Sequence, residues 1–137
     1  MDQRVSFITL AVKDLGLTQR FYVEGLGWES EHHTVGEVLM VKVAEKVVLS
    51  FWAAEHFAEE VGGRPAGGGI PPVTLAHNVA TRDGVDRVLE QVAAAGAEVW
   101  DAEDRDWGGY SGYFADPDGY RWEVAYNPGE IGQSVLP

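Results

Sequence analysis

Residues 107–128 read Trp-Gly-Gly-Tyr-Ser-Gly-Tyr-Phe-Ala-Asp-Pro-Asp-Gly-Tyr-Arg-Trp-Glu-Val-Ala-Tyr-Asn-Pro. Their centre, Asp116-Pro117-Asp118-Gly119, predicts a tight turn, because proline presets φ, aspartate side chains bond back to the backbone and glycine accepts a positive φ. The flanks, residues 110–115 and 120–126, are rich in aromatic and β-branched residues, which favour strands. We therefore predict two antiparallel strands that meet at this turn.

The second of these strands carries a carboxylate at a defined position. Because side chains alternate between the two faces of a strand, Trp122 and Val124 should share one face and Arg121, Glu123 and Ala125 the other. Glu123 is thus held on a rigid element. Three roles stay open for it: to bind a ligand cation, to act as a general base, or to pair with an arginine such as Arg121.

The two halves of the chain repeat one order of elements, β-α-β-β-β. In the first half we expect a helix capped by Asp14 and strands over residues 5–12, 28–33, 37–43 and 46–52. In the second half we expect a helix that begins at Asp83 and ends at Gly96, with strands over residues 73–80, 97–102, 110–115 and 120–126.

The expected organisation is a single domain built from module 1–61, a glycine-rich linker 62–70, module 71–128 and a C-terminal tail 129–137. A short helix is expected over residues 53–61. The linker could be a plain connection or a mobile lid over a ligand. The tail could be a loose end or an arm across a dimer partner.

Composition narrows the class of protein. The 137 residues are 45% hydrophobic, which suffices for a globular interior, and zero cysteines exclude disulfides and thiolate metal sites. No apolar run approaches the ~20 residues of a membrane span, and no signal-peptide layout opens the chain, so we expect a cytoplasmic protein without membrane contact. The net charge of −12 argues against nucleic acid and permits a cationic ligand.

The Asp-Pro-Asp-Gly turn followed by Trp122-Glu123-Val124, the opening segment 7–15 and the repeat resemble the vicinal oxygen chelate superfamily. That superfamily includes glyoxalase I, extradiol dioxygenases, fosfomycin-resistance enzymes and bleomycin-resistance proteins. The resemblance implies an α+β fold in which two βαβββ modules form an open, eight-stranded, barrel-like cleft of the glyoxalase/bleomycin-resistance type, within a homodimer.

In the metal-dependent members, the resemblance implies a divalent ion held by His, Gln or Glu on the first and last strands of each module. These positions fall here on Phe7, Leu49 or Ser50, Thr74, and Glu123. Because Glu123 alone is of a ligand type, no metal or other cofactor is expected, and a divalent metal remains the alternative. His77 should face the helices, although a one-residue slip would turn it inward.

Aromatic residues offer another means of recognition, because their faces bind planar or cationic ligands. Those expected to line or rim the cleft are Trp52, Trp100, Trp107, Tyr110, Tyr113 and Tyr126. The candidate ligand-binding residues are accordingly Trp52, Trp107, Tyr110, Tyr113, Glu123 and Asn78.

Two functions follow. The first is a metal-free protein, similar to the bleomycin-resistance branch, that sequesters a planar or cationic drug or metabolite in an aromatic, acidic cleft and so confers antibiotic resistance. The alternative is a lyase, isomerase or dioxygenase that uses an unusual metal site or Glu123 as its catalytic acid–base group. A scaffolding protein with a vestigial cleft is a third interpretation, because fold does not fix function.

Overall fold

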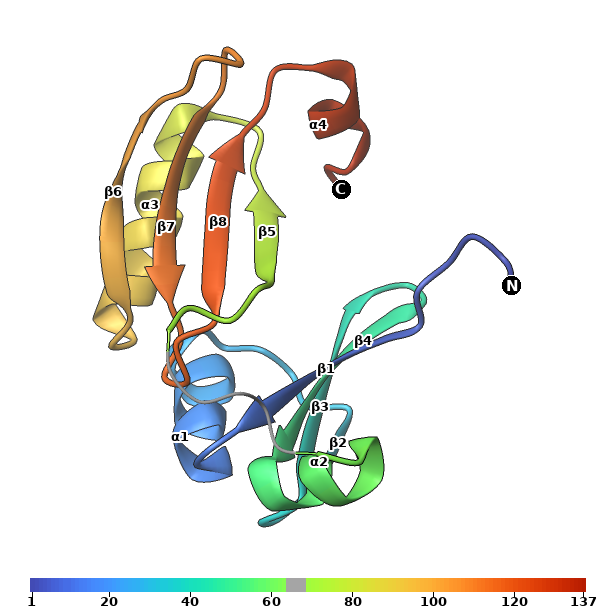
Figure 1. Ribbon diagram of the computed structural model, residues 1–137. Helices are drawn as coiled ribbons and strands as arrows, with labels where there is room; N and C mark the ends of the chain where they lie inside the picture. Colours follow the sequence, from blue (N-terminus) through green and yellow to red (C-terminus); the bar gives the residue numbers. More distant parts are fainter. Residues whose placement is uncertain (64–68) are drawn as a thin grey trace. The chain divides into compact units, whose positions relative to one another are not determined.

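The computed structural model describes residues 1–63 and 69–137, which belong to two compact units, Met1–Gly68 and Gly69–Pro137. Each unit has a four-stranded mixed sheet that is not closed (Figure 1). The predicted α+β class and the repeated β-α-β-β-β order are confirmed. The interpretations of the linker as a connection or a lid depend on residues 64–68, which lie outside the described residues.

The first unit contains, in order, β1 (Phe7–Val12), α1 (Leu15–Gln19), a π-helical segment η1 (Arg20–Gly25), β2 (His32–Thr34), β3 (Val38–Ala44), β4 (Val47–Ala53) and α2 (Ala54–Val61). β1 pairs with β4 in parallel, and the other pairs are antiparallel. Its core includes Leu10, Val12, Leu39, Leu49 and Phe51.

The first helix begins as the sequence predicts and then widens. Asp14 Oδ1 accepts hydrogen bonds from the backbone N–H groups of Gly16 and Leu17 at 2.9 and 3.1 Å, which satisfies the free helix end. In η1 the Leu26 N–H reaches back five residues, to the Phe21 carbonyl. This geometry buries Phe21 and the neighbouring Tyr22 in the core.

The second unit contains β5 (Thr74–Asn78), α3 (Arg82–Ala94), β6 (Glu98–Asp104), β7 (Tyr110–Ala115), β8 (Arg121–Tyr126) and α4 (Glu130–Ser134). Helix α3 covers one face of its sheet and buries Val85, Leu89 and Val92 there (Figure 1). The helix begins before the predicted Asp83, because the Thr81 hydroxyl caps it by accepting from the Gly84 N–H at 3.1 Å.

The predicted hairpin turn is confirmed in detail. Asp116 is buried, and its Oδ1 accepts from the backbone N–H groups of Asp118 and Tyr120 at 3.0 and 2.9 Å. Gly119 takes a φ of 87°, in the left-handed region that glycine favours. The turn therefore fixes the register between β7 and β8.

One prediction about an element was wrong. The strand expected over residues 28–33 is reduced to β2, because the Trp28 N–H bonds to the Tyr22 carbonyl and the Trp28 ring lies 5.1 Å from that of Tyr22. The predicted tail, residues 129–137, contains the short helix α4. Among the described residues, none of the helices has the length and apolar character needed to cross a bilayer.

Candidate functional site

The sheet of the second unit has one face against α3 and one open face. Trp122 and Val124 lie on the α3 face and are buried, as the alternation predicts, so Arg121 and Glu123 lie on the open face. Across the open face one register row runs through four strands, in the order Trp100, Tyr113, Glu123 and Ala76. The sheet therefore brings two of the predicted residues, Tyr113 and Glu123, side by side.

Tyr113 and Glu123 interact directly. Burial raises the pKa of Tyr113 above its ordinary value, and the negative charge of Glu123 and a hydrogen bond to it add to the rise. Arg105 opposes this effect, because its positive charge favours the phenolate. Tyr113 therefore stays protonated near neutral pH, and its hydroxyl can donate to the Glu123 carboxylate.

Arginines of the protein itself lie over three of the aromatic rings in this unit. The distances from guanidinium carbon to ring centroid are 4.9 Å for Arg82 over Tyr110, 5.7 Å for Arg105 over Tyr113 and 3.9 Å for Arg121 over Trp100. These are cation–π distances. One face of each ring is thus already covered by an internal cation.

Two tyrosines do not lie at the cleft positions predicted from the sequence. Tyr110 and Tyr126 pair across β7 and β8 on the α3 face, not in a cleft. The Tyr110 hydroxyl donates to Asp86 Oδ1 on α3 at 2.9 Å, which with burial raises the pKa of Tyr110. The prediction that both line the cleft was wrong, because the alternation of side chains along a strand puts them on the same face as Trp122.

Trp107 and Asn78 lie apart from the Tyr113–Glu123 pair. Trp107 is half exposed in the connection between β6 and β7, and its ring lies directly over Gly109. Asn78 ends β5 beside Ala125, on the open face, and is half-buried. Neither residue pairs with Glu123, whose register partners are Ala76 and Tyr113.

The four metal-ligand positions implied by the resemblance do not supply a metal site. Leu49 and Ser50 are both buried, but the register resolves the choice in β4, because Ser50 occupies the position in its unit that Glu123 occupies in the other. Together with Phe7 and Thr74, these positions offer one carboxylate and two hydroxyls, a poor donor set for a divalent ion. In the described parts of the chain, no three His, Asp or Glu residues are grouped to hold one.

Histidine does not change this conclusion. His77 pairs with Val124 and lies on the α3 face of the sheet, as predicted. The side chain keeps access to solvent, yet the atoms packed around it withdraw it enough from water to lower the pKa of His77 below its ordinary value. The neutral ring is therefore the favoured form in the folded protein.

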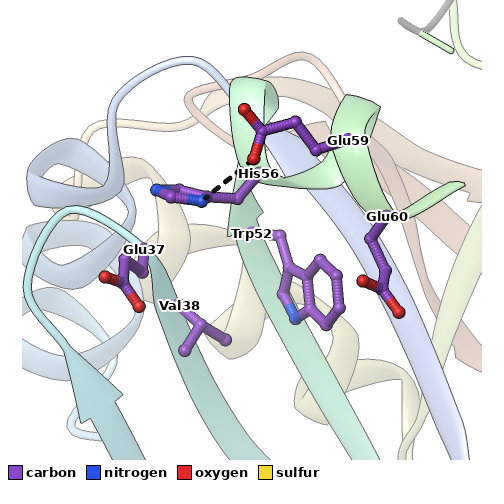
Figure 2. Close-up of a pocket in the computed structure, with 6 residues that line it drawn as sticks. All are labelled: Glu37, Val38, Trp52, His56, Glu59 and Glu60. Carbon is purple, nitrogen blue, oxygen red and sulfur yellow. Dashed lines mark ion pairs between the residues drawn. The ribbon is translucent and has the colours of Figure 1, made fainter. Parts of the chain in front are cut away.

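The first unit contains a pocket of about 230 Å³ at the end of its sheet (Figure 2). It is lined by Glu37, Val38, Trp52, His56, Glu59 and Glu60. Trp52 and Val38 are register partners on β4 and β3, and α2 follows β4 directly. The Trp52 indole N–H donates to Ser50 Oγ at 2.7 Å, which fixes the orientation of the ring.

The pocket is acidic. Three of its six lining residues are glutamates, and His56 Nδ1 lies 3.9 Å from Glu59 Oε2, an ion pair when the imidazole is protonated. None of the described residues that line it is Lys or Arg. An indole face beside several carboxylates can hold an organic cation, because both attract positive charge.

Trp52 is predicted from the sequence, whereas Glu37, His56, Glu59 and Glu60 are not. A signal for two of these four was present in the sequence. His56 and Glu60 are four residues apart in the segment expected to be a helix, a spacing that places side chains on one side of a helix. Glu37 was not accessible in this way, because it reaches the pocket through the pairing of β3 with β4.

Comparisons with known proteins agree with this architecture. A family model described as the Glyoxalase/Bleomycin resistance protein/Dioxygenase superfamily matches residues 4–124. A glyoxalase-related enzyme from Fulvimarina pelagi is 36% identical, with a TM-score of 0.83 over 92% of this chain and 89% of that one. Among curated proteins, no sequence matches the chain significantly.

More distant structures share the fold. A glyoxalase/bleomycin resistance protein/dioxygenase from Nocardioides is 24% identical, with a TM-score of 0.75 over 95% of this chain and 90% of that one. A lactoylglutathione lyase from Agrobacterium tumefaciens is 19% identical, with a TM-score of 0.72 over 92% of this chain and 95% of that one. The repeated module, the hairpin and the family match together establish that the chain belongs to the glyoxalase/bleomycin resistance protein/dioxygenase superfamily.

Proposed function

We propose that the protein binds a small organic cation in the pocket beside Trp52, without a metal ion, and sequesters it as a metabolite or drug. The observation that carries this proposal is the meeting of one indole with three carboxylates, Glu37, Glu59 and Glu60, in one concave site. A formal net charge of −12 adds a long-range attraction for cations.

The size of the pocket indicates the class of ligand. Sites for drug-sized molecules usually measure roughly 300–1,000 Å³. At about 230 Å³ this pocket suits a small amine or the cationic end of a larger molecule. Trp52 should contribute most, because contact of a cation with an aromatic face is worth about 0.5–2 kcal/mol, whereas an exposed carboxylate contributes less.

The test is calorimetric titration with choline and with 3,3-dimethyl-1-butanol, its uncharged isostere. We expect choline alone to bind, and Trp52→Leu to weaken binding roughly 2- to 30-fold. Trp107→Leu is the matched control, because Trp107 is a half-exposed indole in the other unit. Equal binding of the two isosteres, or equal loss in both variants, would contradict the proposal.

The carboxylates need a separate measurement. Glu60→Gln should weaken choline binding by up to about fivefold, since the charge is exposed and partly screened. Glu45→Gln removes the same charge from the exposed turn between β3 and β4, outside the pocket. If both variants lose affinity equally, the effect belongs to net charge and not to the pocket.

A second candidate function is an enzyme that uses Glu123 as an acid–base group. The interaction of the Glu123 carboxylate with the Tyr113 hydroxyl favours it, because a hydrogen bond of this kind orients a general base. The similarity to a glyoxalase-related enzyme supports the same direction. In assays of lyase, isomerase and dioxygenase activity, Glu123→Gln should abolish turnover and Tyr113→Phe should reduce it, whereas Trp52→Leu should leave the chemical step unchanged.

A further inference from the structure

Arg121 on the open face of the second unit is held in place by a ring. Its guanidinium carbon lies 3.9 Å from the centroid of Trp100, two strands away on β6. Ala115, the register partner of Arg121 on the intervening β7, has a methyl group that leaves room for the arginine to cross it. The stack therefore orients a planar cation over the sheet.

The hydrogen bonding of this cation is incomplete. Arg121 Nη1 is buried and has no hydrogen-bond partner among the residues that the structure describes. A buried donor left unpaired is costly, by about 1–3 kcal/mol and more when it is charged. Such a donor points to a group that the chain alone does not supply.

Arg105 provides the internal contrast. It approaches the same sheet, but its Nε donates to Ser111 Oγ at 2.9 Å, its Nη2 to the Ser111 carbonyl at 3.0 Å and its Nη1 to Glu103 Oε1 at 2.6 Å. Every nitrogen of that guanidinium has a partner. Arg105 is thus structural, whereas Arg121 retains an unused donor.

The acidic residue that sequence places closest to Arg121 does not pair with its free donor. Glu123 lies two residues along the same strand face, beside its register partner Tyr113, and makes no hydrogen bond to Arg121 Nη1. Glu98 lies in the same register row as Arg121, across Ala115, and does not bond to its Nη1. A guanidinium presents its donors in a fork that matches the two oxygens of a carboxylate or phosphate.

We propose that Arg121, positioned by Trp100, binds the carboxylate or phosphate group of a small-molecule ligand on the open face of the second unit. This site lies in a different unit from the Trp52 pocket and does not depend on it. The ligand class is also distinct, since the Trp52 pocket recognises positive charge and Arg121 negative charge.

The test is titration of the full-length protein with benzoate, phenylphosphonate and uncharged benzyl alcohol, followed by the NMR signal of the Arg121 Nε–H group. We expect a saturable shift with an anion and none with the alcohol. Stronger binding of benzoate would assign the site to carboxylates, and stronger binding of phenylphosphonate to phosphates. No saturable shift with either anion would overturn the proposal.

Variants distinguish bidentate binding by the Arg121 guanidinium from general electrostatic attraction of the anion. Arg121→Gln should weaken binding of the anion by at least about tenfold, and Arg121→Lys should recover part of it, because lysine keeps the charge but not the fork. Arg87→Gln removes an equal charge from the exposed side of α3 and is the matched control. Equal weakening in Arg121→Gln and Arg87→Gln would also overturn the proposal.

The positioning role of Trp100 has its own readout. Trp100→Leu should weaken anion binding and broaden the Arg121 Nε–H signal, because the guanidinium loses its stacking surface. Should Arg121→Gln fail to fold, Trp100→Leu and Arg121→Lys still decide the question. Trp52→Leu should leave anion binding unchanged, so the two proposed sites can fail independently.

Discussion

At the scale of single residues, the absence of a side chain at Gly109 lets the Trp107 ring pack against the backbone. A Cβ atom at this position would lie 1.6 Å from a ring carbon of Trp107, and its three nearest atoms all belong to that ring. The φ of Gly109 is not in the left-handed region, so the obstacle to a side chain is steric. Trp107 therefore packs on backbone in its own connection and is not free to stack on a ligand with both faces.

We expect Gly109→Ala to destabilise the protein by about 0.5–1 kcal/mol, because the methyl group displaces the far end of the half-exposed Trp107 side chain. In a Trp107→Ala background the same change should cost far less, which gives a coupling energy of roughly 0.5–1 kcal/mol. Urea unfolding of the wild type, both single variants and the double variant measures it. Strictly additive effects would show that something other than the ring limits Gly109.

His77 predicts a pH dependence of stability. Its folded pKa lies below the ordinary value, so in the window between the two the unfolded chain binds more protons. The stability that this group contributes is present above about pH 6.5 and is lost as pH falls through the folded pKa.

This dependence can be isolated by substitution. The free energy of unfolding of the wild type should fall more steeply between pH 7.5 and 5.5 than that of His77→Gln. Urea unfolding at several pH values measures both curves. Parallel curves would mean that His77 has the same proton affinity in both states.

At the scale of elements, the hairpin at residue 116 depends on one side chain. Asp116→Ala removes an acceptor used by two backbone N–H groups in a buried turn and should cost about 1–3 kcal/mol. Asp116→Asn keeps an Oδ1 acceptor and should retain most of this stability. Thermal unfolding distinguishes them, with Asp101→Ala on the exposed part of β6 as the control. A loss in Asp116→Asn equal to that in Asp116→Ala would assign the effect to charge.

The elements also show what sequence can predict. The Asp116 turn and the Asp14 cap are local, because each is completed within a few residues, and both are predicted correctly. The strand expected near Trp28 is not local, because packing against Tyr22 after a π-helical segment draws Trp28 out of the sheet. The local sequence pattern alone does not predict this competition between strand pairing and packing against Tyr22.

The candidate site also has features that the local sequence predicts and features that depend on distant segments. Alternation on β8 places Glu123 correctly, and carried across the turn it would also have placed Tyr110 on the α3 face. The pocket beside Trp52 needs the pairing of β3 with β4, which brings Val38 and Glu37 from more than ten residues away. The stack of Arg121 on Trp100 likewise spans three strands. Such contacts between distant segments are set by the sheet as a whole.

At the scale of the whole molecule, the donor chemistry predicts the response to metals. Nickel, zinc, manganese and iron(II) should leave the melting temperature unchanged, because Phe7, Ser50 and Thr74 replace the ligands that would accompany Glu123. A metal at a hundred times its Kd would instead add about 2.7 kcal/mol to stability. Thermal shift and elemental analysis of protein purified without chelators check this. A stoichiometric metal that is lost in Glu123→Ala would contradict it.

Assembly is the second prediction at this scale. We expect a homodimer, as the family resemblance implies, and large apolar side chains remain exposed on the isolated chain, including Val5, Phe7 and Val43. Sedimentation equilibrium should give twice the monomer mass. A Val5→Ser, Phe7→Ser double variant should shift the equilibrium toward monomer, whereas Val35→Ser, an exposed control near β2, should not. A monomeric wild type at micromolar concentration would contradict the expectation.

The matching register of the two sheets has a consequence for how such a chain can change over time. Thr9 pairs with Ser50 in one unit as Ala76 pairs with Glu123 in the other, so the same strand arrangement carries different side chains in the two units. The buried face of each sheet maintains the fold of its unit, and the residues on the opposite face can be substituted independently in each unit. Because each unit supports its own sheet, the two open faces can carry different chemistry: Glu123 offers a carboxylate in one unit where Ser50 offers a hydroxyl in the other.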